Sequence, residues 1–99
     1  MQNGLKIKWT EESVDNLNAI IGYLQRHWTN KELTDFFSKL EKQLVIISLF
    51  PEAFPLFEEM QLRRCVLTKQ TSINYIIEEQ HVVILSLFDN RKELRSNLK

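Results

Sequence analysis

The stretch that decides the fold is the last third of the chain, where the runs LRRCVLTK (Leu62–Lys69), SINYIIE (Ser72–Glu78) and VVILSLF (Val82–Phe88) follow one another. Each run is rich in β-branched and aromatic residues and is short enough to be a single strand. The breaks between them are short and polar, which favours antiparallel pairing of consecutive strands in a meander. The last run is apolar on nearly both faces, so we expect it to lie inside the sheet.

One short strand and two amphipathic helices are expected upstream of this stretch. The alternation of apolar and basic residues over 5–9 predicts a half-buried strand. A first helix is predicted from Glu11 to His27, with Thr10 as its N-cap. A second is predicted over 30–49, ahead of the helix-breaking Pro51. The sequence therefore predicts an α+β fold in the order β-α-α-β-β-β, with a small, mainly antiparallel sheet packed against an N-terminal helical hairpin.

Two details inside the helical region carry further expectations. Thr29 followed by Glu32 matches a capping box, which predicts that the second helix starts there. Gly22 lies in the middle of the first helix, where glycine costs about 1 kcal/mol relative to alanine. We expect a close approach of another element to account for that glycine.

Composition bounds the class of protein. The 99 residues, 43% hydrophobic and 26% charged, fit one domain over 1–99. The net charge is zero, but residues 1–60 hold six Lys and Arg against nine Asp and Glu, and 61–99 hold seven against four. The β-rich third thus allows a modest anion-binding surface, short of a strongly basic nucleic-acid binder. The single Cys65 fits a reducing compartment, and without a signal peptide or membrane span we expect a cytoplasmic protein with no membrane partner.

An unusually aromatic loop, PEAFPLF (51–57), follows the second helix. It is either a hydrophobic lid packed against the helices or a patch that binds a partner. The residues expected in a partner site are Phe54 and Phe57 of this loop and Trp28 at the end of the first helix.

Several segments, taken in order, resemble the RelE/ParE superfamily of toxins from bacterial type II toxin–antitoxin systems. They are the first strand with Trp9, the helical segment IIGYL (20–24), the proline after the second helix, the strand INYII (73–77) and the ending ILSLFDNR (84–91). The ending, a strand that runs into a polar turn and an arginine, is the most specific of them. The resemblance covers nearly the whole chain.

The resemblance implies a small growth-inhibiting toxin that forms a hetero-oligomer with a cognate antitoxin and is neutralised by it. RelE-like members cleave mRNA on the ribosome, whereas ParE-like members block DNA gyrase without that nuclease site. Neither activity needs a metal or a cofactor. Three readings stay open: a metal-independent endoribonuclease, a non-catalytic gyrase inhibitor, and an inactive member that only binds its antitoxin.

By this resemblance the catalytic candidates are Arg91, Arg64, Lys69 and Tyr75. Arg91 matches the arginine that RelE-like members use near the scissile phosphate, and Tyr75 matches the aromatic position of the middle strand. RNA cleavage without a metal also needs a base and an acid, and neither is evident. The arginine that RelE-like nucleases usually carry just upstream of the tyrosine would fall near Ser72, and its absence weakens the nuclease reading.

Each candidate also has a structural role open to it. Arg91 is suited to an ion pair with Asp89 or Glu93, and Tyr75 to the core of the sheet. Arg63 and Arg64 are neighbours in a strand, so their side chains should point to opposite faces. At most one of them can therefore join a given site.

Overall fold

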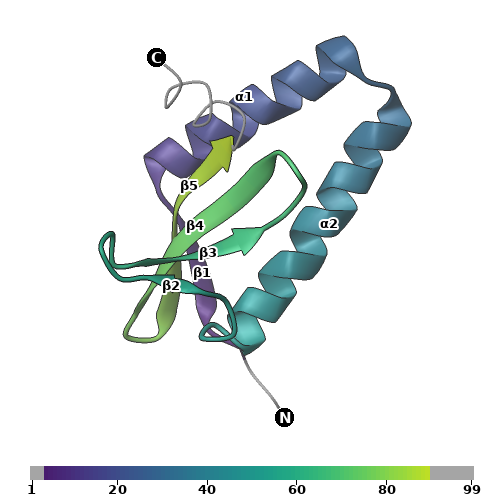
Figure 1. Ribbon diagram of the computed structural model, residues 1–99. Coiled ribbons are helices and arrows are strands. Elements are labelled where there is room, and N and C mark those ends of the chain that lie inside the picture. The colour runs from purple at the N-terminus through teal and green to yellow at the C-terminus, as the bar shows by residue number, and fades with distance from the viewer. Residues whose placement is uncertain (1–3, 90–99) are drawn as a thin grey trace.

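The computed structural model describes residues 4–89, which form one strand, two helices and then four strands (Figure 1). The elements are β1 (Lys6–Trp9), α1 (Glu11–His27), α2 (Asn30–Leu49), β2 (Leu56–Phe57), β3 (Leu62–Val66), β4 (Thr71–Glu78) and β5 (His81–Asp89). The predicted α+β class is confirmed, and both helices have the predicted bounds. The two-residue strand β2 is additional, because it lies in the stretch that was expected to be a loop.

The strands form a single sheet in the order β1-β5-β4-β3-β2. Strands β2 to β5 pair antiparallel in chain order, so the predicted meander is confirmed. Strand β1 pairs in parallel with β5, with Lys6 opposite His81 and Trp9 opposite Ile84. The last strand therefore lies inside the sheet, as expected, and the first strand lies at its edge.

Side-chain caps fix where the two helices begin. The Thr10 hydroxyl accepts a hydrogen bond from the Ser13 N–H (3.1 Å) and donates one to the Ile84 carbonyl (2.9 Å), which ties the start of α1 to β5. At α2 the Thr29 N–H donates to the Glu32 carboxylate (3.1 Å), and the Thr29 hydroxyl also contacts that carboxylate. The hydrogen bond from the Thr29 side chain is the main cause that lowers the pKa of Glu32. The predicted capping box is confirmed.

Both helices pack on one face of the sheet, which we call the inner face, and they diverge from their short connection along it (Figure 1). The opposite, outer face carries Arg64 and Asn74, and no helix of residues 4–89 contributes to it. The core between helices and sheet is apolar. Its buried members are Phe36, Leu40, Ile47, Cys65, Leu67, Ile73, Tyr75, Val82, Ile84 and Leu87.

Glycine marks a close approach at a different position from the one expected. A Cβ on Gly22 would meet only the Arg26 guanidinium, at 3.4 Å, so the expected tight contact in mid-helix is wrong. A Cβ on Gly4 would instead collide with the Ser48 hydroxyl and would lie 3.0 Å from the Ser48 carbonyl carbon. Gly4 thus lets the start of the chain pass against the end of α2.

Candidate functional site

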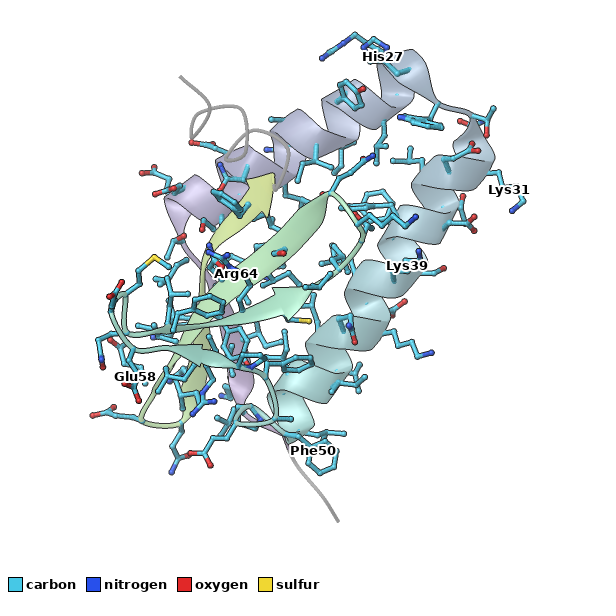
Figure 2. The ribbon with its side chains drawn as sticks, viewed as in Figure 1. His27, Lys31, Lys39, Phe50, Glu58 and Arg64 are labelled. Atoms are coloured by element: carbon cyan, nitrogen blue, oxygen red, sulfur yellow. The ribbon has the colours of Figure 1, made fainter. Side chains whose placement is uncertain are left out.

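On the outer face, the Arg64 side chain is held between two aromatic rings. Its guanidinium carbon lies 4.7 Å from the centre of the Phe57 ring and 5.1 Å from that of Phe88. The Nε–H donates to the Asn74 side-chain carbonyl at 2.9 Å. Stacking and hydrogen bonding of this kind fix the plane of the guanidinium. In Figure 2 the side chain lies against the strands, away from Lys39 of α2.

Strand register builds this cluster, which we call the Arg64 clamp (Arg64, Phe57, Phe88, Asn74 and Ser86). Arg64 pairs with Asn74 across β3 and β4, and Asn74 pairs with Ser86 across β4 and β5. The Asn74 amide donates to the Ser86 hydroxyl at 3.1 Å, so the three side chains form a row over three strands. A β-bulge follows, between Asn74 and Tyr75, and bulges of this kind redirect side chains.

The Arg64 clamp suits an anion. A guanidinium has five N–H donors, and Asn74 uses the one on Nε, which leaves the terminal nitrogens for a phosphate or carboxylate oxygen. The residues of 4–89 that contact this guanidinium are neutral. The clamp can therefore stabilise negative charge, whereas proton transfer would have to come from groups outside it.

Tyr75 lies on the inner face, opposite to Arg64. Its side chain is fully buried, its ring packs edge-to-face on Phe54, and its hydroxyl donates to the Pro51 carbonyl at 2.6 Å. Burial raises the pKa of Tyr75 to about 12, opposed by the charge of nearby Arg63. The structure thus does not bring Tyr75 and Arg64 together.

Arg63 holds the aromatic loop in place. Its Nη1 donates to the carbonyl of Phe54 at 2.7 Å and to that of Glu52 at 3.3 Å. The Arg63 side chain thus lies on the inner face of the sheet and the Arg64 side chain on the outer face. The expectation that these neighbours face opposite ways is confirmed.

The remaining catalytic candidates are not among the residues that contact Arg64, or they lie beyond the described chain. Lys69 is exposed in the turn between β3 and β4. Arg91 lies outside the described residues. The catalytic roles of all four candidates stay predictions.

The three partner candidates fall into different environments. Phe54 is half-buried against the core, in the manner of a lid. Phe57 is 38% exposed and belongs to the Arg64 clamp, and Trp28 is 48% exposed at the end of α1. Their partner roles also stay predictions.

Sequence reasoning missed two features. Phe88 and Asn74 were not expected near Arg64, because cross-strand register is needed to place them. A shallow apolar groove of about 350 Å³ between β1 and α2 was also missed. Its lining residues are Ile7, Glu41, Leu44, Val45, Ser48 and Leu49. The alternation at 5–9 and the long apolar stripe of α2 were the available signals for the groove.

Within 4–89, no group of three or more His, Cys, Asp or Glu side chains is placed to hold a metal ion. Neither of the two described helices is long and apolar enough to cross a lipid bilayer.

Similarity to known proteins is found at the level of structure. No protein-family model matches the sequence. No curated protein sequence matches it either. A chain of the chromosomal ParDE TA system from P. aeruginosa aligns with a TM-score of 0.71 at 15% identity, over 86% of this chain and 95% of that one.

Two further toxin structures share the architecture. The YoeB/ParE toxin from Agrobacterium tumefaciens aligns with a TM-score of 0.64 at 17% identity, over 86% of this chain and 98% of that one. A copper-bound mutant toxin from Helicobacter pylori aligns with a TM-score of 0.54 at 14% identity, over 89% and 97%. The chain therefore has the RelE/ParE-like toxin fold that its sequence resemblance implied.

Proposed function

We propose that this protein is the toxin of a type II toxin–antitoxin system and that a cognate antitoxin neutralises it. The observation that carries the proposal is the fold, since the likeness extends over 95% and 98% of the two chains with the highest TM-scores given above. One of these chains comes from a ParDE TA system and the other is a YoeB/ParE toxin.

Exposed apolar surface supports a protein partner. Large exposed apolar patches mark protein–protein interaction sites, whereas hydrophobic side chains scattered singly over a surface are ordinary. Ten large hydrophobic side chains of residues 4–89 are at least 38% exposed, and Phe57 and Trp28 are among them. The full set is Val14, Tyr23, Trp28, Phe37, Val45, Phe50, Leu56, Phe57, Met60 and Val66.

For the mode of action we infer inhibition by binding, with DNA gyrase as the first target to test. Arg64 and Tyr75 lie on opposite faces of the sheet, so they do not form one catalytic pair. The groups that contact Arg64 are neutral, and a clamp of this kind recognises an anionic group of a target without reacting with it.

Cleavage of ribosome-bound mRNA is the second candidate. It is favoured by the fixed Arg64 guanidinium, whose free N–H groups suit the charge that develops on a phosphate during cleavage. Arg91 would be the second cation of such a site.

The test is tightly controlled induction in a bacterial host with pulse labelling of DNA and protein synthesis. Early loss of DNA synthesis supports gyrase inhibition, and early loss of protein synthesis with cleaved transcripts supports the nuclease. Arg64→Ala should relieve the arrest, whereas Arg26→Ala, which removes an exposed arginine of α1, should not. Co-expression of the adjacent small open reading frame should restore growth and yield a complex. Normal growth with folded protein, together with no complex, contradicts the proposal.

A further inference from the structure

Two aromatic rings cover the faces of the Arg64 guanidinium. Phe57 comes from β2 and Phe88 from β5, and these strands lie on opposite sides of β3 in the sheet. The guanidinium carbon lies over both rings, 4.7 Å and 5.1 Å from their centres. Rings in this position stabilise the cation through their π faces and hinder the approach of other groups from above or below it. A ligand therefore reaches Arg64 in the plane of the guanidinium.

Asn74 occupies one of the two in-plane approaches. A guanidinium pairs with a two-oxygen anion either side-on, through Nε and one terminal nitrogen, or end-on, through both terminal nitrogens. The Asn74 side-chain carbonyl accepts the hydrogen bond of the Arg64 Nε–H at 2.9 Å, which takes the side-on approach. The end-on approach, through Nη1 and Nη2, is left for a ligand.

The next side chain in the row fixes the direction of the Asn74 amide. Asn74 is only 6% exposed, and its NH2 group donates to the Ser86 hydroxyl at 3.1 Å. A buried amide needs partners at both ends, so this hydrogen bond keeps the NH2 on the β5 side and the carbonyl toward Arg64. The acceptor offered to Arg64 is thus neutral, and the guanidinium keeps its full charge for a ligand.

The space between the rings suits a flat anion. The two oxygens of a carboxylate and both of its carbon atoms lie in one plane, so the group can lie edge to edge with a guanidinium. A phosphodiester also offers two oxygens, but its ester oxygens project above and below the plane that contains them. Between two rings these projecting groups would crowd against Phe57 and Phe88. Charge agrees with shape, because one carboxylate balances one guanidinium whose contacts within 4–89 are neutral.

We propose that the Arg64 clamp is a carboxylate site, which binds an aspartate or glutamate side chain of a protein target end-on, and that Asn74 is its positioning residue. Phe57 and Phe88 select the flat anion, and Asn74 holds the guanidinium plane without neutralising its charge. The part of this ligand in growth arrest rests on the function proposed above; the preference for a carboxylate does not.

The test compares two small monoanions, acetate and dimethyl phosphate, by NMR titration of the purified, isotope-labelled protein at constant ionic strength. The readout is the Nε–H signal of Arg64, which is assigned by its loss in Arg64→Lys. Acetate should bind about threefold or more tightly than dimethyl phosphate. Equal binding, or no binding of acetate, overturns the proposal. Tighter binding of dimethyl phosphate also overturns it and favours a nucleic-acid backbone as the ligand.

Phe57→Leu tests the selection by shape. Phe57 is 38% exposed, so the protein should still fold, and acetate and dimethyl phosphate should then bind about equally well. Phe88→Leu should have the same effect, because it removes the other ring. A preference for acetate that persists in both variants contradicts the role given to the rings.

Asn74→Asp tests the positioning residue through charge. The new carboxylate would pair with Arg64 in place of the ligand, so acetate binding should fall about tenfold or more while the protein stays folded. Asn18→Asp makes the same change at an exposed position of α1 and should leave acetate binding unchanged. Circular dichroism and thermal unfolding check the fold. Lower stability of Asn74→Asp with unchanged acetate binding would show a merely structural residue and would overturn its positioning role.

Growth assays separate this site from the proposed function. If Arg64→Ala relieves the arrest while the unmodified protein shows no preference for acetate, the carboxylate site is wrong and the toxin proposal stands. If acetate is preferred and Asn74→Asp abolishes its binding, but induction leaves growth normal and no antitoxin binds, the toxin proposal is wrong and the carboxylate site stands. If both proposals hold, Asn74→Asp relieves the arrest as Arg64→Ala does, whereas Asn18→Asp does not.

Discussion

The two faces of the sheet are built from the same strands but differ in the surroundings of their side chains. On the inner face Ile73, Tyr75 and Ile84 are fully buried in the core, and the polar hydroxyl of Tyr75 has a partner inside the molecule. On the outer face Arg64 is held from its sides by Phe57 and Phe88, while its terminal nitrogens have no hydrogen-bond partner among residues 4–89.

The difference is clearest at two neighbouring arginines. Arg63 donates to carbonyls of its own chain and holds the aromatic loop in place. The Arg64 guanidinium is held in one orientation, and its terminal N–H groups can still bind an anion. The alternation of a strand thus turns Arg63 toward the loop that it holds and leaves Arg64, which we propose as a binding residue, on the outer face. Substitutions on the inner face should act on folding, and those on the outer face on function.

The largest effect is expected from a cavity on the inner face. Ile84→Ala removes a fully buried side chain in β5, an interior strand of the sheet, and should lower the free energy of unfolding by about 3 kcal/mol. The matched change Val66→Ala on the outer face removes a side chain that is 60% exposed and should cost less than about 0.5 kcal/mol. Urea unfolding measures both; equal losses would contradict the division between the faces.

The second largest effect is expected at high pH, which should lower the free energy of unfolding through two buried groups of the inner face. Burial raises the pKa of Tyr75 to about 12 and that of Cys65 to about 11. Between pH 9 and 12 the unfolded chain loses these protons before the folded one does, so stability should fall as pH rises, by about 2 to 3 kcal/mol for Tyr75 alone. Urea unfolding from pH 8 to 12 should show this fall, and Tyr75→Phe should reduce its slope. An unchanged slope in that variant would show that Tyr75 does not titrate late.

Arg63 and Arg64, which are neighbours in β3, test whether the inner face acts on folding and the outer face on function. Arg63→Ala loses two hydrogen bonds from a charged donor and should cost about 2 kcal/mol, with growth arrest kept at equal amounts of folded protein. Arg64→Ala should cost about 1 kcal/mol and abolish the arrest, because of these two guanidinium groups it is that of Arg64 that faces outward. Thermal unfolding and growth after induction measure the two effects; loss of arrest with Arg63→Ala alone would reverse the assignment.

The sequence predicts correctly those features of the fold that depend on residues close together in the chain. The helix bounds follow from Thr10, Thr29 and Pro51, which act within a few residues, and they were predicted correctly. Strand alternation likewise predicted that Arg63 and Arg64 face apart. Strand β2 was missed because two residues between turns carry no periodicity.

The site needed information that one segment of sequence does not hold. Phe88 reaches Arg64 only through the register of β5 on β4, and the bulge after Asn74 changes that register. The open edge of β1 depends on which strand it pairs with, and a parallel partner more than seventy residues away gives no local signal. Such long-range pairings are where sequence patterns lose their predictive value.

Effects smaller than that of Ile84→Ala, and opposite in sign to each other, are expected at two glycines, one packed closely against another element and one not. Gly4→Ala pushes a methyl group into Ser48 where α2 meets β1, and should cost about 1 to 2 kcal/mol because the Ser48 backbone cannot move aside easily. Gly22→Ala meets only the mobile Arg26 guanidinium and should instead stabilise α1, by about 0.5 to 1 kcal/mol. Thermal unfolding of the two variants should therefore shift in opposite directions. A loss of stability with Gly22→Ala would mean that the Arg26 side chain cannot move aside, and would remove the contrast between the close contact at Gly4 and the looser one at Gly22.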